Sequence, residues 1–299
     1  IAQRAIALLV EAGEFTRAHA WAERATQSGP ESRALLEARA DLESRLGLQA
    51  EEIGSLARLA RLLSGPELNR CLHRRADLQL AQGDGAAAVE SLEAALASEP
   101  ERIATLQALA DAYQRLGRAA DQVRCLRGWA EAASPDHRAE PLTRLASLLE
   151  DPIGDLDAAV AVRSRILELP APPAGAARAL ESLLEIAGRH TELTALLDRE
   201  RQRLGDETTE APLLDLRRGR LRLDALGDCD GAAKIFAALH EREPENEEIL
   251  TLLERALRAG HDADGLCDLL AQRATWAASP IARAPFDLER AQLLEEVLG

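Results

Sequence analysis

The fold is decided by a stretch in the middle of the chain, residues 103–136, which reads IATLQALADAYQRLGRAADQVRCLRGWAEAASPD. In its first half, apolar residues recur every three or four positions from Leu106 to Tyr113, which is the spacing of one helix face. Gly117 then interrupts the pattern, and glycine is the residue that best tolerates the left-handed backbone at a helix end. A second helical pattern runs up to Pro135, which cannot continue a helix. The stretch therefore predicts two helices joined by a turn at Gly117.

Glycines in the same role recur along the whole chain at a nearly regular interval, namely Gly13, Gly47, Gly83, Gly117, Gly154, Gly188, Gly227, Gly260 and Gly299. Prolines follow most of them about half an interval later, at Pro30, Pro66, Pro100, Pro135, Pro170, Pro244 and Pro280. The segment after Gly188 lacks this proline and is expected to end near Gly205-Asp206. The repetition predicts eight helix hairpins, each with two helices of about 12 to 16 residues, and the first helix of a ninth.

A single helical hairpin cannot bury its apolar face, so successive hairpins must stack on one another. The predicted fold is all-α: a right-handed α-solenoid that forms one continuous domain over residues 1–299. An acid follows every second glycine of the series, as in Gly83-Asp84, where the dipole of the next helix favours negative charge. The other glycines are followed by different residues, as in Gly260-His261. We interpret this alternation as a pairing of hairpins into super-repeats of about 70–73 residues.

At these positions the sequence resembles the tetratricopeptide repeat (TPR), a helix–turn–helix unit of about 34 residues. The matching residues in the two best copies are Leu72, Ala76, Gly83, Ala88, Leu92, Ala95, Leu106, Leu109, Ala110, Tyr113, Gly117 and Leu126. The sequence departs from the family at Gln122, Trp129 and Arg220, which stand where small residues are usual. The resemblance covers nearly the whole chain. It implies a protein-interaction fold in which the first helix of each hairpin lines the surface that binds extended peptides or partner helices.

Composition agrees with a helical chain and excludes several classes of protein. The 299 residues include only 26 of the β-favouring Val, Ile and Thr, and no apolar run reaches the length of a membrane span. The net charge of −15 disfavours binding to nucleic acid, whose phosphates it would repel. Residues 1–138 carry a net charge of −3 and residues 139–299 carry −12. The acidic half could attract a basic partner, although a solvated surface is the simpler interpretation.

The chain has no Met and begins inside the repeat pattern, so we expect a fragment of a longer repeat protein. Of its 36 basic residues 35 are Arg, a bias typical of GC-rich bacterial genomes. The cysteines are far apart in the sequence, which favours buried thiols in a reducing, cytoplasmic location over disulfides or a zinc site; they are Cys71, Cys125, Cys229 and Cys267.

No motif for chemistry is present. The six histidines form no HExxH sequence and no pair spaced by four residues, so we expect no metal site. A phosphate-binding GxxxxGK[ST] loop is absent, and the single lysine, Lys234, lies inside a predicted helix. A GxSxG nucleophile motif is absent too. The sequence predicts a chain that is not an enzyme and uses no cofactor.

The resemblance assigns groove positions on the first helices of hairpins two to five. Projected onto this sequence they are Glu37, Asp41, Ser44, Arg70, His73, Asp77, Gln107, Asp111, Gln114, Thr143, Ser147 and Glu150, the last three lying in a hairpin with one residue inserted near its turn. Two basic strips stand out, and we expect their arginines to pair with acids of neighbouring helices; they are Arg70, His73, Arg74 and Arg75, and Arg217, Arg218, Arg220 and Arg222. The aromatic residues fall within the helices and are expected in the core: Phe15, Trp21, Tyr113, Trp129, Phe236 and Trp276.

Three functions follow as hypotheses. The first is a non-enzymatic scaffold that binds a peptide or a partner helix on its concave face. The second is the recognition arm of a larger enzyme whose catalytic domain lies outside this sequence. The third is self-assembly through the ends of the solenoid. The identity of a protein partner is left open by the sequence.

Overall fold

A computed structural model of the chain describes residues 2–28, 32–99, 102–205 and 208–298. Within these residues the chain forms 17 α-helices and no β-strand, which confirms the all-α prediction. The chain divides into two compact units, Ile1–Ala176 and Ala177–Gly299. The continuity of one solenoid over residues 1–299 stays a prediction.

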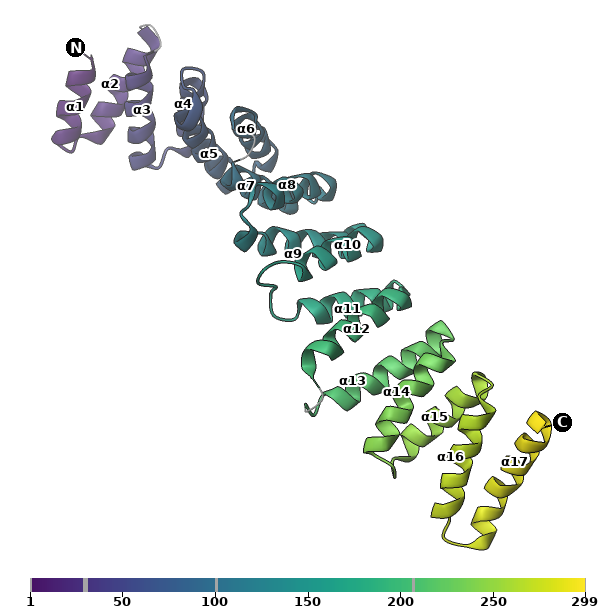
Figure 1. The fold of residues 1–299 in the computed structure, drawn as a ribbon. Helices are drawn as coiled ribbons and strands as arrows, with labels where there is room; N and C mark the ends of the chain where they lie inside the picture. Colours follow the sequence, from purple (N-terminus) through teal and green to yellow (C-terminus); the bar gives the residue numbers. More distant parts are fainter. Residues whose placement is uncertain (1, 29–31, 100–101, 206–207, 299) are drawn as a thin grey trace. The chain divides into compact units, whose positions relative to one another are not determined.

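The first unit consists, in its described residues, of five hairpins of antiparallel helices (Figure 1). They are α1 (Ala2–Glu11) with α2 (Phe15–Ser28), α3 (Arg33–Leu46) with α4 (Gln49–Ala60), α5 (Gly65–Ala81) with α6 (Gly85–Ser98), α7 (Ile103–Arg115) with α8 (Ala119–Ala132), and α9 (Ala139–Leu148) with α10 (Leu156–Leu167). The second helix of each hairpin contacts the first helix of the next, from α2 with α3 to α8 with α9. The hairpins of this unit therefore stack as the repeat pattern predicts.

The second unit continues the same pattern. Its helices are α11 (Ala176–Ile186), which begins at the boundary, α12 (His190–Leu204), α13 (Ala211–Leu221), α14 (Cys229–Arg242), α15 (Glu247–Ala259), α16 (Ala263–Trp276) and α17 (Pro280–Leu298). Over the described residues the chain thus holds eight hairpins and one further helix, α17, as predicted. The TPR resemblance is confirmed at the level of the fold.

The turn glycines behave as predicted at seven positions, where φ lies between 65° and 81°: Gly13, Gly47, Gly83, Gly117, Gly154, Gly188 and Gly227. A Cβ atom added at Gly83 would meet no atom within 4 Å, so backbone conformation alone requires glycine there. The acids that follow Gly83, Gly154 and Gly227 cap the next helices, each accepting a backbone N–H at 3.0 Å; they are Asp84, Asp155 and Asp228. Gly299 lies outside the described residues.

Gly260 does not take the left-handed conformation, so that prediction is wrong. Its φ is −81°, and the left-handed residue is its neighbour His261, with φ of 55°. The turn is displaced by one residue, and Asp262 becomes the helix cap, accepting the Gly265 N–H at 2.9 Å. A side chain at Gly260 would approach the Cβ of Cys229 to 3.2 Å, so close packing accounts for this glycine.

Replacing His261 with glycine is expected to raise the free energy of unfolding by about 0.5 to 1 kcal/mol, because it removes the left-handed penalty of a residue with a Cβ. His261 is exposed, so little packing is lost. Urea denaturation followed by circular dichroism measures the change. The matched variant Gly83→Ala introduces the same penalty and should lower stability by about 1 kcal/mol. A destabilised His261→Gly protein would contradict this account of the turn.

The prolines separate the hairpins, as predicted. Pro66 lies in the first turn of α5, Pro280 begins α17, and Pro135 opens a short 3-10 helix, η1 (Pro135–His137), between α8 and α9. Pro170 and Pro244 lie in the connections after α10 and α14. Three further positions of the predicted boundaries, Pro30, Pro100 and Asp206, lie outside the described residues.

Two hairpins contain an inserted residue, which takes the form of a π-helical turn at the end of the first helix. The turns are η2 (Leu149–Ile153), as expected for hairpin five, and η3 (Arg222–Leu226). The second insertion corrects the position assigned to Arg220. The small residue of that hairpin is the buried Gly219, eight residues before Gly227, whereas Ala76 lies seven before Gly83. A count of seven residues back from Gly227 gives Arg220, because it leaves out the extra residue of the π-turn.

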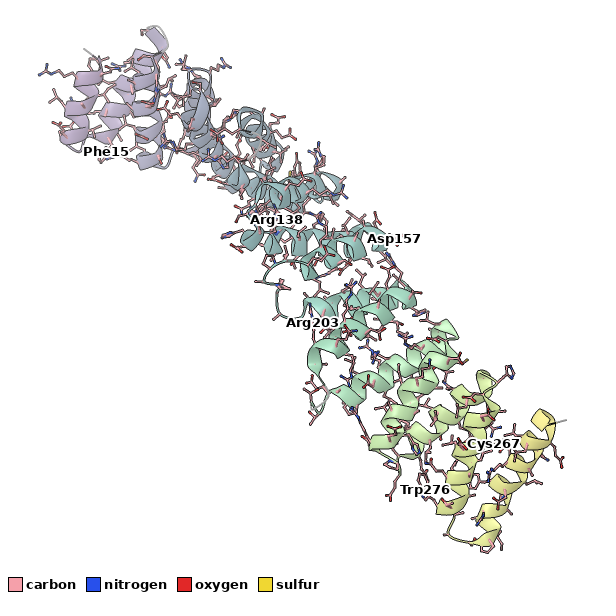
Figure 2. All side chains as sticks on the ribbon, viewed as in Figure 1. Phe15, Arg138, Asp157, Arg203, Cys267 and Trp276 are labelled. Atoms are coloured by element: carbon pink, nitrogen blue, oxygen red, sulfur yellow. The ribbon has the colours of Figure 1, made fainter. Side chains whose placement is uncertain are left out.

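Most predicted core positions are buried. Tyr113, Trp129 and Phe236 are at most 2% exposed, and Cys71, Cys125 and Cys267 are buried free thiols. Burial raises the pKa of the Cys125 thiol to about 11. Trp21 and Trp276 contradict the core prediction, since they are 48% and 47% exposed. Trp276 ends α16 (Figure 2), where it packs edge-on against His240, with the ring centroids 5.8 Å apart.

Candidate binding groove on the first helices

The structure places the twelve predicted groove residues on one set of helices in the first unit. They lie on α3, α5, α7 and α9, with Glu150 in the π-turn η2. None of them is buried. Seven are exposed, namely Asp41, Ser44, Arg70, Asp77, Asp111, Gln114 and Ser147, and the other five are half-buried. A partner could therefore reach all of them.

Two of the predicted acids are already bound by arginines of the following hairpin. Asp41 accepts a hydrogen bond from Arg74 at 3.2 Å, and Asp111 accepts one from Arg144 at 2.5 Å, each across 33 residues of sequence. In the second unit Arg217 bonds Glu181 in the same way, at 2.6 Å. The three arginines follow one another at the interval of the predicted super-repeat, so the pairing recurs at every second hairpin. These acids hold neighbouring first helices together.

The second basic strip serves the same purpose, as expected, whereas in the first strip only Arg74 is paired with acids within the described residues. The Nε atom of Arg75 is buried there without a hydrogen-bond partner. Arg74 also bonds Glu52, whose side chain is only 3% exposed, at 2.6 Å. In the second strip all four arginines contact acids of other helices or turns: Arg217 contacts Glu181 and Glu185, Arg218 contacts Asp198, Arg220 contacts Glu248, and Arg222 contacts Asp198 and Asp228. Among the described residues Arg70 forms no such pair.

His73 is a neutral member of the groove. Its Nε2 lies 2.8 Å from the Oγ1 of Thr105 on the next first helix, α7. Burial, assisted by the positive charge of Arg102, lowers the pKa of His73 below its ordinary value, against the opposing effect of Asp77. His73 is therefore uncharged near neutral pH and acts as a hydrogen-bonding group, not as a cation.

Other predicted residues are held by local contacts. Glu37 accepts from Arg33 at 2.8 Å, and Arg33 also bonds Glu67 of the next hairpin. Glu150 is bound by Arg163 at 2.7 Å, and the Thr143 hydroxyl donates to a backbone carbonyl of its own helix. Five residues have no side-chain hydrogen bond or ion pair with another residue of the described chain: Ser44, Arg70, Asp77, Gln107 and Ser147. At these five positions a ligand would displace no side-chain bond of the described chain.

A pocket of about 400 Å³ opens where the fourth and fifth hairpins meet. Three predicted residues, Gln114, Thr143 and Ser147, line it together, and Gln122, Arg144 and Asp151 complete its polar wall. Amide and hydroxyl groups can both donate and accept hydrogen bonds, which suits a peptide backbone or a neutral polar side chain. The remaining predicted residues of α3 and α5 do not line this pocket.

Sequence reasoning missed Arg144, Gln122 and Pro152 as pocket residues. The sequence does contain a signal for Arg144. This residue stands one super-repeat after Arg74, and an acid lies 33 residues before each of the two arginines. Pro152 enters only because the π-turn η2 brings it to the pocket, and no spacing rule predicts that turn's shape. In the sequence, Gln122 stands out only as a departure from the family pattern, in a position where small residues are usual.

Two negative observations apply to the described residues. No three or more His, Cys, Asp or Glu side chains gather there in a way that could hold a metal ion. None of the helices in that part of the chain combines the length and the apolar character needed to cross a membrane.

Comparison with known proteins identifies similar folds and no family. No protein-family model matches the chain, and no curated protein matches it. Among solved structures, Naa15/Naa10 bound to HypK-THB is 20% identical, with a TM-score of 0.49 over 94% of this chain and 43% of that chain. This chain thus spans less than half the length of that one. A tetratricopeptide repeat protein from Parabacteroides merdae is 19% identical, with a TM-score of 0.39 over 86% and 97% of the two chains.

A third similar structure is YrrB, described as a TPR protein with an unusual peptide-binding site. It is 12% identical, with a TM-score of 0.39 over 54% of this chain and 84% of that chain. All three TM-scores lie below 0.5, so the assignment of the fold rests on the helices and turns described above.

Proposed function

We propose that this chain is a non-enzymatic scaffold that binds an extended peptide or a partner helix along the first helices of its hairpins. The observation that carries the proposal is the pocket between hairpins four and five, where Gln114, Thr143 and Ser147 converge. The five groove residues without partners extend the same helix face toward α3. Stacked hairpins offer a long surface for recognition, since each adds one helix to it.

Residues whose charge is paired with a neighbouring hairpin should not be altered in a test of ligand binding. Asp41 and Asp111 are bound to Arg74 and Arg144, so reversing their charge would disturb the packing of hairpins as well as a ligand. Arg70 and Asp77 carry no such pair within the described residues, and Ser147 lines the pocket. Substitutions at these three positions should therefore change ligand binding without breaking an ion pair between hairpins.

We expect peptides selected from a displayed random library against this chain to lose about tenfold in affinity for the variant Arg70→Asp, Asp77→Arg, Ser147→Trp, a loss equal to about 1.4 kcal/mol. The two charge reversals leave the net charge unchanged, and the tryptophan fills the pocket. Affinity is measured by isothermal titration calorimetry, and circular dichroism checks that helicity is kept.

The matched control reverses the same pair of charges on exposed residues of second helices, Glu90→Arg on α6 and Arg127→Asp on α8. It should leave peptide affinity unchanged. Selected peptides that bind the groove variant as well as the native chain would overturn the proposed surface. Light scattering over a range of protein concentrations tests the alternative of self-assembly, which predicts a mass that grows with concentration.

A further inference from the structure

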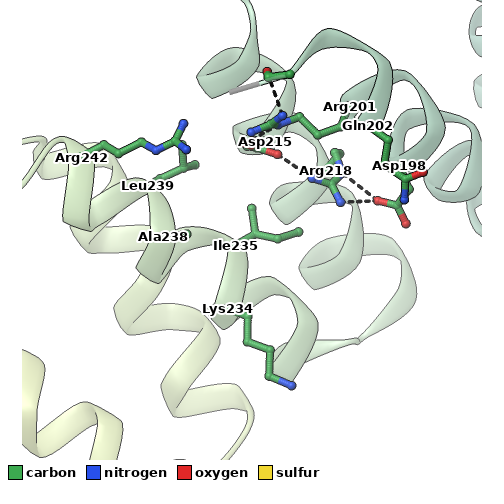
Figure 3. Close-up of a pocket in the computed structure, with 11 residues that line it drawn as sticks. Asp198, Arg201, Gln202, Asp215, Arg218, Lys234, Ile235, Ala238, Leu239 and Arg242 are labelled. Carbon is green, nitrogen blue, oxygen red and sulfur yellow. Dashed lines mark hydrogen bonds and ion pairs between the residues drawn. The ribbon is translucent and has the colours of Figure 1, made fainter. Parts of the chain in front are cut away.

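Two pockets of the structure differ in whether their acids are already paired. The larger one, of about 650 Å³, lies in the second unit and is bordered by α12, α13 and α14 (Figure 3). Both of its carboxylates are bonded by arginines of the same pocket, Asp215 by Arg201 at 2.8 Å and Asp198 by Arg218 at 2.5 Å. The pocket of about 400 Å³ between hairpins four and five is different, because two of its polar side chains have no partner in the described chain.

The first of these side chains is Gln122 on α8. It lines the pocket and is only 6% exposed, yet its amide forms no hydrogen bond with another residue of the described chain. Glu52 and Leu193 stand at the same place in hairpins two and six, five residues after the turn glycine. Glu52 is bonded by Arg74 at 2.6 Å, whereas Leu193 is apolar and 1% exposed. The fold thus accepts a paired or an apolar side chain here, and a buried amide without a protein partner is costly unless water or a ligand bonds it.

The second side chain is Asp151, in the π-turn η2 that borders the pocket. It is exposed and forms no hydrogen bond or ion pair with another residue of the described chain. Its counterpart in the other π-turn, η3, is Asp224, which like Asp151 stands three residues before the glycine that ends the turn. Asp224 is bonded by Arg255. Asp151 therefore presents a carboxylate whose charge no contact of the described chain neutralises.

The charge of the other ionised side chain of this pocket, Arg144, is already matched. Its guanidinium bonds Asp111 at 2.5 Å and Gln114 at 3.4 Å, and it lies over the ring of Trp129, 5.7 Å from the centroid. Asp111 does not line the pocket. The unpaired charge of the pocket is thus negative, and it belongs to a chain whose net charge of −15 attracts cations.

The remaining wall includes apolar surface from Ala119, Leu148 and Pro152. Arginine and lysine side chains suit such a mixture, because their methylene stems pack on apolar groups while the charged heads reach polar ones. Both heads are hydrogen-bond donors, and a carboxylate and an amide oxygen are both acceptors.

We infer that this pocket binds a basic side chain, arginine or lysine, of a bound peptide. Its charged head donates hydrogen bonds to Asp151 and Gln122, and its stem packs on Leu148 and Pro152. The inference rests on the proposed function, because the side chain enters from a peptide that lies along the first helices. It adds the chemical class of one peptide residue.

The test titrates the capped peptide Ala-Val-Arg-Val-Ala into the whole isotope-labelled chain and follows the backbone amide of Ser147 and the side-chain amide of Gln122 by NMR. We expect both signals to shift to saturation at millimolar peptide. The dissociation constant should rise about fivefold or more for Asp151→Asn, since one ion pair is lost with little change in shape. The control Asp136→Asn removes the same charge from an exposed residue outside the pocket and should bind as the native chain does.

The variant Gln122→Leu separates binding from stability. Because Leu193 occupies the same place in hairpin six, the variant should be at least as stable as the native chain in urea denaturation. It should nevertheless bind the arginine peptide about fivefold more weakly, measured through Ser147. A loss of stability together with unchanged binding would assign Gln122 a structural role and contradict its place in the site.

Two further peptides complete the test. Citrulline in place of arginine keeps the shape and removes the charge, so it should weaken binding at least about fivefold. Lysine in place of arginine shows which head the pocket prefers, and binding of either basic peptide supports the site. Equal binding of the citrulline peptide, or unchanged binding to Asp151→Asn, would overturn the cation site and leave the groove standing. If neither basic peptide shifts the two signals, the cation site is likewise overturned, whereas the groove itself fails only if library-selected peptides bind its triple variant undiminished.

Discussion

Replacing Gly219 with alanine is expected to lower the free energy of unfolding of the second unit by about 3 kcal/mol. A Cβ at this position would lie 2.4 Å from Cε1 and 2.6 Å from Cζ of Phe236, well inside contact distance. Phe236 is fully buried in the core that joins α14 to α15, so its ring would have to move against neighbouring core side chains. Overpacking of this kind forces side chains from their preferred rotamers or pushes helices apart.

Urea denaturation followed by circular dichroism measures the effect as a lower midpoint. Gly54→Ala is the matched control, because Gly54 lies inside α4 with no atom within 4 Å of the added Cβ, and alanine there should stabilise by up to about 1 kcal/mol. The double variant Gly219→Ala, Phe236→Leu should recover part of the loss. A Gly219→Ala protein as stable as the native chain would show that the two helices do not pack as described.

Replacing Arg39 with methionine is expected to lower the free energy of unfolding by about 3 kcal/mol, because it leaves a buried carboxylate without its main partner. The side chain of Glu43 is 0% exposed and accepts from Arg39 Nε at 2.7 Å. Its other described contact is His19 Nε2 at 3.3 Å. Arg39 also donates to Thr26 at 3.1 Å, so its loss removes one of the polar contacts between α2 and α3.

The double variant Arg39→Met, Glu43→Met should be close to native stability, since a buried ion pair can often be replaced by apolar side chains of similar size. Arg17→Met is the control, because its pair with Glu14 is exposed and should contribute less than about 1 kcal/mol. All three are compared by chemical denaturation. If the double variant were as unstable as Arg39→Met, the cost would come from lost packing and not from the unpaired charge.

Much of the fold could be predicted because the signals are local. A left-handed residue at a helix end and an acid at the next helix start act within a few residues, as at Gly83 and Asp84, so spacing alone predicts both helices. The errors occurred where one inserted or displaced residue shifted the count. At Gly219 the cause was a π-turn, and at His261 a turn that moved by one position.

The exposed tryptophans show a different limit. Trp21 and Trp276 have helical spacing that is compatible with burial, yet both are about half exposed, since the described chain covers only part of each side chain. Periodicity indicates which face of a helix is apolar. Whether another element covers that face depends on the position of the neighbouring hairpin.

By itself the sequence determined that the described part of the chain is all-α, that this part holds eight helix hairpins and a further helix, and where the described hairpin turns lie within about one residue. Only the tertiary structure decided which charges meet. Asp41 and Asp111, predicted to face a ligand, are bound to Arg74 and Arg144 across 33 residues. The pocket of α12, α13 and α14 likewise exists only where three helices converge. Helices follow from interactions within a turn of the backbone, whereas pairs and pockets depend on how one hairpin is set against the next.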